Sequence, residues 1–372
     1  MTTPPVVPPA VRDPGAVRPK ERGRTVNRRV TLKDVAAYAG VSRATASLVV
    51  RESGQLSDAT RDRVREAMNV LGYVYHRGAA SLRASHTKTV GLVVPEISNP
   101  FTAEYVMGAE AEFAERDVVV LFSNAFESKA RQQAVVRSLM EQQVDGLVIT
   151  PALGSDPSFI AYLAAAGIPV VISIRPVDDS TLPYVGTDNI RGGELAGAHL
   201  VAHGTRNIVY MGGLDGLTPR ADRVEGVVRG LAQSARRGRL VADICGPATG
   251  RFGYEATMQL LEKNALPEGI VCHNDTVAFG IYRALRDHAP QHVDTVRVIG
   301  FDNVDEAALW EPPLTTLAVN GREVGRLAAN ALARRIFEPD GAPERVLLTP
   351  ELVVRRSCGH DLVEPYLESH PT

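Results

Sequence analysis

The 372-residue sequence predicts an α/β protein, in which an N-terminal helix-turn-helix headpiece precedes a core of two doubly wound parallel-sheet lobes. Residues 30–75 read as short helices, the first two of which lie around a single glycine within residues 30–50. From Thr89 onward, apolar strand-like runs such as "TVGLVVP" and "DGLVITP" alternate with helix-length segments, and the same alternation restarts after His203 with "RNIVYMGG". Apolar strands that alternate with helices are typical of parallel sheets covered on both faces, and these strands are too many for one small sheet.

Charge is distributed unevenly along the chain. The whole sequence has a net charge of −2, but residues 1–83 hold 15 lysines and arginines against 7 acidic residues, so the remainder is acidic. A basic head on an acidic body indicates a nucleic-acid-binding module joined to a body with another task. A basic tail without a target is the alternative interpretation.

The composition favours a cytoplasmic location. No apolar run approaches the roughly 18 residues of a membrane span, and prolines occupy the N-terminus where a signal peptide needs an apolar core. The three cysteines, Cys245, Cys272 and Cys358, lie far apart in the sequence, which suits a reducing compartment. We therefore expect a cytoplasmic, nucleoid-associated protein without a membrane partner.

Two short helices are expected within residues 30–50, "VTLKDVAAYAGVSRATASLVV", after a disordered basic arm over residues 1–29. Thr31 can cap the first helix, and Gly40 can end it because glycine adopts a left-handed backbone at little cost. Ser42 can cap the second helix.

The two helices together predict a helix-turn-helix unit. Ala46 and Val49 of the second helix face inward, whereas Arg43, Thr45 and Ser47 are polar and face outward. Such a unit places the N-terminal residues of its second helix in the DNA major groove. A helical hairpin inside a larger core is the alternative, but it does not explain the outward polar face beside so many basic residues.

Residues 30–50 resemble the N-terminus of the lactose-repressor (LacI/GalR) family of bacterial transcription regulators. The likeness extends from Val30 to about His360, and further matching segments follow in the family's order: "LSDATRDRVREAMNVLGYVY", "AASLR", "TVGLVVPEISNPF", "QQVDGLVI", "GTDNIRGGELAGAHLVAHG", "RVEG", "HNDTVAFG", "VIGFDNVDEAALWEPPLTTL" and "LLTPELVVRRS". The resemblance implies a core similar to periplasmic binding proteins, with a small polar effector between the lobes.

The resemblance also implies a domain organisation. We expect a DNA-binding headpiece over residues 30–75, a hinge helix or linker over 76–87, an effector-binding core over 88–360 and a tail over 361–372. The first lobe of the core would cover about residues 88–203 and 318–345, and the second about 204–317 and 346–360.

Residues of the headpiece can be assigned to DNA contacts by the same resemblance. Arg43, Ala44 and Ser47 fall on the base-reading face of the second helix. Contacts to the DNA backbone are expected from residues with a hydroxyl group near helix starts: Thr31, Ser42, Thr45, Ser57 and Thr60. Arg43 is the strongest candidate for direct reading because a guanidinium can bond a guanine edge at two points, and a phosphate contact is its alternative role.

Leu48 departs from the family pattern. Many members carry an arginine there and use it on guanine, whereas leucine can only touch a thymine methyl group or a hydrocarbon neighbour. Arg51, about one turn later, could supply part of the missing charge. The operator is therefore not expected to copy those of better-known relatives.

The hinge sequence "RGAASLRAS" contains Leu82, which matches the family's minor-groove leucine. An apolar wedge of this kind unstacks a base step and kinks the duplex. Packing against the core is the alternative role for Leu82. Wedging requires one leucine from each of two subunits, so the resemblance implies a homodimer on a near-palindromic site in double-stranded DNA.

Candidate effector contacts lie at positions expected to face the cleft between the lobes: Asn99, Phe101, Thr150, Arg223, Asn274 and Asp302. Arg223 matches the family's position for gripping ligand oxygens. An arginine donates several hydrogen bonds and a carboxylate accepts a pair of hydroxyls, which suits a sugar or a related metabolite. A structural role is the alternative for each residue, and Asp275 is expected to cap a helix. The loop "GPATGRF" lacks the aromatic residue that several relatives stack on a sugar, so a galactoside is not supported.

Motifs of common enzymes are missing, including GxxxxGK[ST], GxSxG, HExxH and paired CxxC. His199 and His203 lie one helical turn apart, but no third ligand supports a metal site. We expect no catalytic residue, no metal and no cofactor. The sequence therefore predicts a DNA-binding transcriptional repressor that is controlled by a small polar effector. A solute-binding protein of periplasmic type without a DNA role is the alternative.

Overall fold

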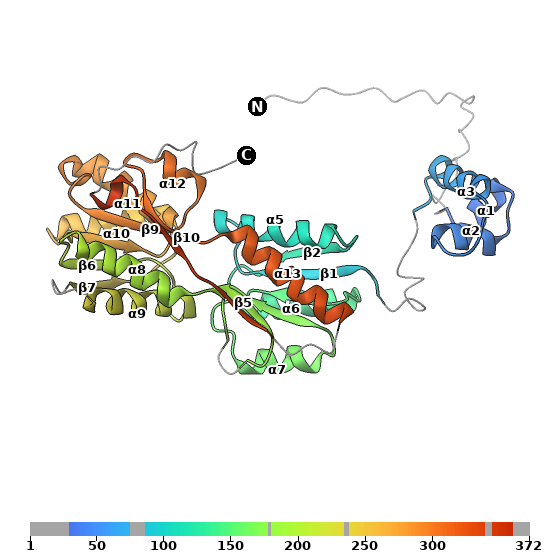
Figure 1. Cartoon of the computed structure of the whole chain (residues 1–372), viewed down its shortest axis with the longest axis horizontal. Coiled ribbons are helices and arrows are strands. Elements are labelled where there is room, and N and C mark those ends of the chain that lie inside the picture. The colour runs from blue at the N-terminus through green and yellow to red at the C-terminus, as the bar shows by residue number, and fades with distance from the viewer. Residues whose placement is uncertain (1–29, 75–85, 178–179, 234–237, 339–343, 360–372) are drawn as a thin grey trace, which may run out of the picture. The chain divides into compact units, whose positions relative to one another are not determined.

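The computed structural model describes residues 30–74, 86–177, 180–233, 238–338 and 344–359 (Figure 1). The chain divides into two units, Met1–Arg83 and Ala84–Thr372. The expected arm, Leu82 with most of the expected hinge, and the expected tail all lie outside the described residues. No helix in the described ranges has the length and apolar character needed to span a membrane.

The first unit contains the helices α1 (Leu32–Ala39), α2 (Arg43–Val50) and α3 (Asp58–Leu71). A capping box begins α1, because the Thr31 hydroxyl accepts the Asp34 N–H and the Asp34 carboxylate accepts the Thr31 N–H. Gly40 ends α1 in a left-handed conformation with φ of 64°. A small apolar core of α1, α2 and α3 residues, including Ala46 and Val49, holds the three helices together. The predicted helix-turn-helix arrangement is present.

The first lobe is a six-stranded parallel sheet in the order β11-β5-β4-β3-β1-β2. Its strands are β1 (Thr89–Val94), β2 (Val119–Asn124), β3 (Leu147–Ile149), β4 (Val170–Ser173), β5 (Tyr184–Thr187) and β11 (Arg345–Leu348). Successive strand residues point to opposite faces, so Leu92 and Val93 enter different cores. One core lies under α5 (Pro100–Ala114) and α13 (Gly321–Phe337), and the other under α6 (Lys129–Glu141) and α7 (Pro157–Ala165).

The second lobe repeats this three-layer arrangement with the strand order β12-β10-β9-β8-β6-β7. Its strands are β6 (Asn207–Met211), β7 (Arg239–Ile244), β8 (Gly269–Cys272), β9 (Arg297–Asp302), β10 (Thr315–Ala318) and β12 (Glu351–Val353). The helices are α8 (Asn189–Ala202) and α9 (Thr218–Ala232) on one face, α10 (Gly250–Glu262) and α11 (Asp275–His288) on the other, and the short α12 (Asp305–Leu309), η1 (Pro290–His292) and η2 (Arg356–Cys358). Only β12 among these strands is antiparallel to its neighbour.

The chain crosses between the lobes at different points from two of those expected. We placed the first boundary near residue 203, but α8 packs on α9 of the second lobe, so the crossing comes between β5 and α8, at Asp188. We also assigned residues from 346 onward to the second lobe. Instead, β11 pairs with β5 of the first lobe, and the crossing follows at residues 349–350. The sequence shows where elements begin, but not the sheet on which each one packs.

Glycines explain why α8 belongs to the second lobe. A Cβ atom on Gly226 of α9 would lie 2.1 Å from the Ile190 carbonyl oxygen of α8, and one on Gly230 would lie 2.3 Å from the Glu194 carbonyl oxygen. A Cβ atom on Gly193 of α8 would lie 2.2 Å from the Arg223 carbonyl oxygen. The two backbones therefore touch along this crossing, which only glycine allows.

The Gly226→Ala substitution should destabilise the second lobe, because the added methyl group must displace backbone rather than a flexible side chain. We expect the free energy of unfolding to fall by about 1–3 kcal/mol or more, measured by urea denaturation of the full chain. Gly250→Ala is the control, since its Cβ atom would lie 3.3 Å from the nearest atom, the Thr276 carbonyl oxygen. Equal losses in both variants would contradict the close helix crossing.

Candidate functional sites

The N-termini of α2 and α3 carry the same pair of hydroxyl groups. At the start of α2, the Ser42 hydroxyl accepts the Thr45 N–H at 3.0 Å, and the two side-chain oxygens are 2.8 Å apart. At the start of α3, the Ser57 hydroxyl accepts the Thr60 N–H at 3.4 Å, and the two oxygens are 2.9 Å apart. Helix N-termini favour anions, so both ends are suited to phosphate groups.

The exposed side of α2 begins with Arg43 and Ala44, and Ser47 follows it half-buried. Arg51, which caps the C-terminus of α2, folds back so that its Nε donates to the Ser47 carbonyl oxygen at 3.2 Å. Arg43 is thus an exposed cation at the N-terminal end of the helix, where base contacts are expected.

Leu48 is half-buried and lies against the turn after α2. A Cβ atom on Gly54 would lie 3.4 Å from both Leu48 methyl carbons. The Leu48 side chain therefore fills the space beside Gly54 within the headpiece. Lys33 and Tyr38 of α1 are exposed as well, and Tyr38 is 58% exposed. No local sequence pattern indicated that these two side chains lie on the surface.

Arg223 on α9 is held at three points inside the second lobe. Its Nε donates to the Asn189 side-chain oxygen at 2.8 Å, and one Nη donates to the His273 carbonyl oxygen. The guanidinium carbon lies 3.5 Å from the centre of the Phe301 ring, within the range of a cation–π contact. Burial lowers the pKa of Arg223, and the Tyr210 hydroxyl and the Asp302 carboxylate oppose that effect.

Asp302 ends β9 at the junction of the two lobes. Burial raises the pKa of its carboxyl group to about 7, although the Arg223 guanidinium and a hydrogen bond from Asn99 of the first lobe both lower it. Its backbone is left-handed with φ of 111°, and Asn303 follows with φ of 56°. Ile174, which follows β4, is also left-handed with φ of 61°. Such a conformation is rare for a β-branched residue, and strained backbone clusters at functional sites.

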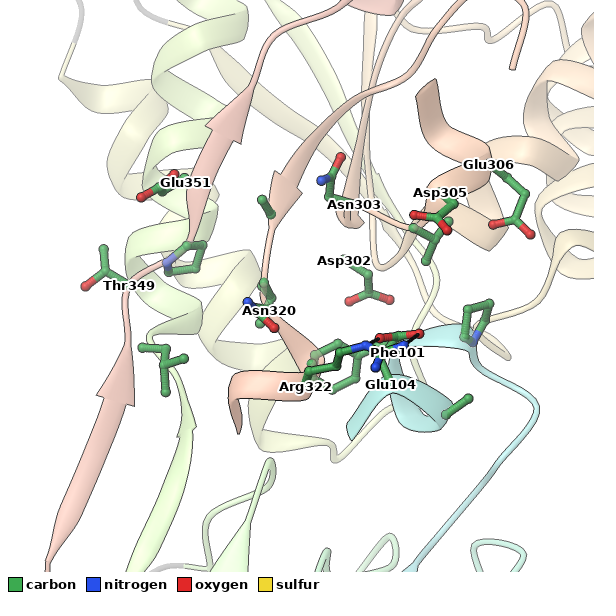
Figure 2. A pocket seen from close by; sticks show the side chains of 18 residues that line it. Phe101, Glu104, Asp302, Asn303, Asp305, Glu306, Asn320, Arg322, Thr349 and Glu351 are labelled. Carbon is green, nitrogen blue, oxygen red and sulfur yellow. Dashed lines mark hydrogen bonds and ion pairs between the residues drawn. The ribbon is translucent and has the colours of Figure 1, made fainter. Parts of the chain in front are cut away.

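Two cavities meet at this junction. The inner one, about 20 Å³, has room for little more than one water molecule and is lined by Phe101, Ile174, Thr187, Asn189, Pro219, Arg223, Asp302 and Val319. The outer one is a cleft of about 850 Å³. Figure 2 shows Asp302 above the first turn of α5, which carries Phe101 and Glu104, with Arg322 paired to Glu104. Phe101, Asp302 and Val319 line both cavities and so form the wall between them.

The other three predicted effector residues have structural partners. The Asn99 side-chain oxygen caps α5 through the Phe101 N–H at 2.9 Å. The Asn274 side-chain oxygen caps α11 through the Val277 N–H at 3.0 Å, while its amide donates to the Ala248 carbonyl oxygen at 3.2 Å. Thr150 is buried, with its hydroxyl oxygen 3.1 Å from that of Ser173. The structure therefore brings Phe101, Arg223 and Asp302 together, with Asn99 beside Asp302.

Asp275 differs from expectation. Asn274, not Asp275, caps α11. One Asp275 carboxylate oxygen accepts the Val304 N–H after β9, and the other accepts the Thr316 hydroxyl of β10. Burial and the Asp302 carboxylate raise the pKa of Asp275. The sequence could not show this, because the partners lie 29 and 41 residues away along the chain.

Comparison with known proteins agrees with this arrangement. The family model for bacterial regulatory proteins of the lacI family matches residues 31–75, and that for periplasmic binding proteins and the sugar-binding domain of the LacI family matches residues 87–358. The chain belongs to the LacI family. This LacI-family chain is 31% identical over 331 residues to the ribose operon repressor of Escherichia coli strain K12, covering 88% of this chain and 99% of that protein. It is also 32% identical over 337 residues to the regulator CelR of Thermobifida fusca, covering 89% and 98% of the two chains.

Solved structures of the LacI family show the same architecture. The lac repressor dimer bound to operator and the anti-inducer ONPF has a TM-score of 0.79 at 25% identity, covering 89% of this chain and 99% of that one. A complex of CelR with cellobiose has a TM-score of 0.66 at 31% identity, covering 88% and 100% of the two chains. The predicted family and fold are therefore confirmed.

The raised pKa of Asp302 predicts how stability depends on pH. The folded state holds this proton up to about pH 7, whereas an unfolded aspartate loses it near pH 4. The folded state therefore binds more protons between these values, and stability falls as the pH rises through this window. Relative to the Asp302→Asn variant, wild type should lose about 1 kcal/mol or more of unfolding free energy between pH 4 and pH 7.

Urea denaturation of both proteins at several pH values would measure this difference. Asp305→Asn, in the neighbouring helix α12, is the control because it makes the same substitution at a nearby position. A constant difference between wild type and Asp302→Asn across the window would contradict the assignment.

Proposed function

We propose that this LacI-family chain is a transcriptional repressor that binds a near-palindromic operator as a homodimer and is controlled by a carbohydrate effector. The observation that carries the proposal is the combination, in one chain, of the capped helix α2, which begins with an exposed Arg43, and a cavity at the lobe junction lined by both Arg223 and Asp302. A solute-binding protein without a DNA role would need no reading helix.

The charges around the lobe junction favour an uncharged polar effector. Arg223 faces Asp302, Arg175 is paired with Glu127 at 2.7 Å, and the buried Arg220 is paired with Asp243. Because Arg175 and Arg220 each already have a carboxylate partner, an anion would gain little from them, whereas hydroxyl groups can bond to both members of a pair. The related proteins named for ribose and the CelR complex with cellobiose support a carbohydrate.

The way the junction is built supports coupling between effector and DNA. Phe101 belongs to the first lobe, whereas Arg223 and Asp302 belong to the second, and the inner cavity between them is small. A sugar placed in that cavity would have to displace side chains of one lobe relative to the other. The effector would then favour one lobe arrangement, and effector and operator would change each other's affinity by the same factor.

The remaining assignments follow from the family. We propose that Arg43, Ala44, Ser47 and Leu48 face the bases, and that Thr31, Ser42, Thr45, Arg51, Ser57 and Thr60 lie along the DNA backbone. Leu82 would supply the minor-groove wedge from each subunit. We also propose that the protein acts beside DNA in the cytoplasm and has no catalytic role, since its named relatives are repressors and regulators.

The operator can be found by incubating the full chain with fragmented genomic DNA and sequencing what it retains. A single near-palindromic motif is the expected result, and binding to it should weaken steeply with salt because phosphate contacts release counterions. Retention of DNA without any common motif would contradict a sequence-specific regulator.

The Arg43→Ala variant tests direct reading by the second helix. If Arg43 reads a base, operator affinity should fall by about 1–3 kcal/mol, while affinity for unrelated duplex changes little. Fluorescence anisotropy on both DNAs, at several salt concentrations, measures this. Arg63→Ala on α3 is the control because it removes the same charge from another exposed position. Equal weakening on both DNAs by Arg43→Ala would show a phosphate contact instead.

The Arg223→Lys variant tests the effector site. Lysine keeps the charge but loses the fork that bonds neighbouring hydroxyls, so we expect the sugar affinity to fall by about tenfold or more, which corresponds to roughly 1.4 kcal/mol. D-ribose and cellobiose are the probes, and titration calorimetry with and without operator is the measurement. Arg229→Lys, on the same helix but exposed, is the matched control. Wild-type affinity in Arg223→Lys would exclude Arg223 from the site.

A further inference from the structure

The turn that presents Asp302 to the lobe junction is an unusual piece of backbone. Asp302 and Asn303 are consecutive residues with φ of 111° and 56°, and neither is glycine. A left-handed pair of this kind persists only where the surroundings fix it. The position of the Asp302 carboxylate therefore depends on whatever holds residues 303 and 304.

Asp275 accepts the hydrogen bonds that fix residues 303 and 304. It is fully buried at the start of α11, and one carboxylate oxygen accepts the Val304 N–H at 2.9 Å. The other accepts the Thr316 hydroxyl at 2.5 Å, and that hydroxyl in turn accepts the Asn303 N–H at 3.3 Å. One carboxylate thus fixes both backbone N–H groups that follow Asp302, directly or through a single hydroxyl.

The strand beneath Asp275 is shaped for this contact. A Cβ atom on Gly300 of β9 would lie 2.0 Å from the nearer Asp275 carboxylate oxygen. Only glycine at this place in β9 therefore leaves room for the carboxylate to pass over the strand. Because Asn274 already caps α11, the Asp275 side chain is not needed at the helix end.

Arg355 is a second residue that binds this turn. This buried residue donates from one Nη to the Asn303 side-chain oxygen at 2.8 Å and from the other to the Leu314 carbonyl oxygen at 2.8 Å. Thr316 belongs to β10, which leads into the crossing before α13, and Arg355 follows β12, which comes from the crossing at residues 349–350. The turn is therefore tied to two of the strands that connect the lobes.

We propose that Asp275 is a positioning residue for effector binding: with Thr316 and Arg355 it holds the left-handed turn that places Asp302 in the lobe junction and joins that turn to the interlobe connections. Asp275 does not contact the effector itself, because it is fully buried and both of its oxygens are occupied. This inference rests on the proposed role of Asp302 in effector binding.

Two isosteric variants test the proposal in the full chain. Thr316→Val removes the bridging hydroxyl and leaves the Asn303 N–H without its acceptor. Asp275→Asn replaces one accepting oxygen with a donor, so the Val304 N–H and the Thr316 hydroxyl can no longer both donate to this side chain. Hydrogen exchange followed by mass spectrometry should show faster exchange over residues 302–306, by about tenfold. Thr257→Val, which removes a buried hydroxyl elsewhere in the same lobe, is the control and should leave that segment unchanged.

Titration with D-ribose separates positioning from a general loss of stability. In the wild-type background, Thr316→Val should weaken ribose binding by about tenfold, and in an Asp302→Asn background it should weaken it no further, since contacting residues are strongly coupled. Unchanged exchange at residues 302–306, or equal affinity losses in both backgrounds, would overturn the proposal. If wild type does not bind D-ribose at all, the choice of sugar fails, and the exchange result alone decides the role of Asp275.

Discussion

The core depends on a half-buried carboxyl group at the end of β9. Asp302 lies close to the Arg223 guanidinium and accepts a hydrogen bond from Asn99 of the other lobe, yet burial still raises its pKa to about 7. A carboxyl group with this pKa changes readily between charged and neutral forms, and its environment differs strongly from water. A bound hydroxyl group or a small lobe displacement would therefore alter the energy of this junction more than that of an exposed site.

The rest of the core keeps this carboxylate in place. Parallel strands in each lobe bring their carboxyl ends to one edge, which is where ligands bind in open α/β sheets. Glycine contacts between α8 and α9 fix the helix that carries Arg223 against the helix that carries Asn189, its hydrogen-bond partner. Asp275 and Arg355 fix the turn on the other side. Much of the second lobe can thus be understood as a support for the Arg223 and Asp302 side chains.

Local features were accessible from the sequence for a physical reason. The Thr31 and Ser42 caps and the Gly40 helix end involve residues within a few positions of each other, so the sequence alone displays both partners. Site residues beyond the caps were harder to interpret. Asn274 and Asn99 were predicted as effector contacts, and the structure shows that their side-chain oxygens cap α11 and α5. A polar residue between a strand and a helix suits both roles, and only its neighbours in space separate them.

The sequence by itself determined the headpiece, the alternation of strands and helices, the family, and the departure at Leu48, because each depends on short-range pattern. Tertiary structure alone decided which sheet α8 and β11 join, which candidate residues meet at the lobe junction, and what Asp275 holds. Those outcomes depend on contacts between segments far apart in the chain, such as Asp275 with Thr316 or Gly226 with Ile190. Such contacts are set by backbone approach and burial, which a one-dimensional pattern does not record.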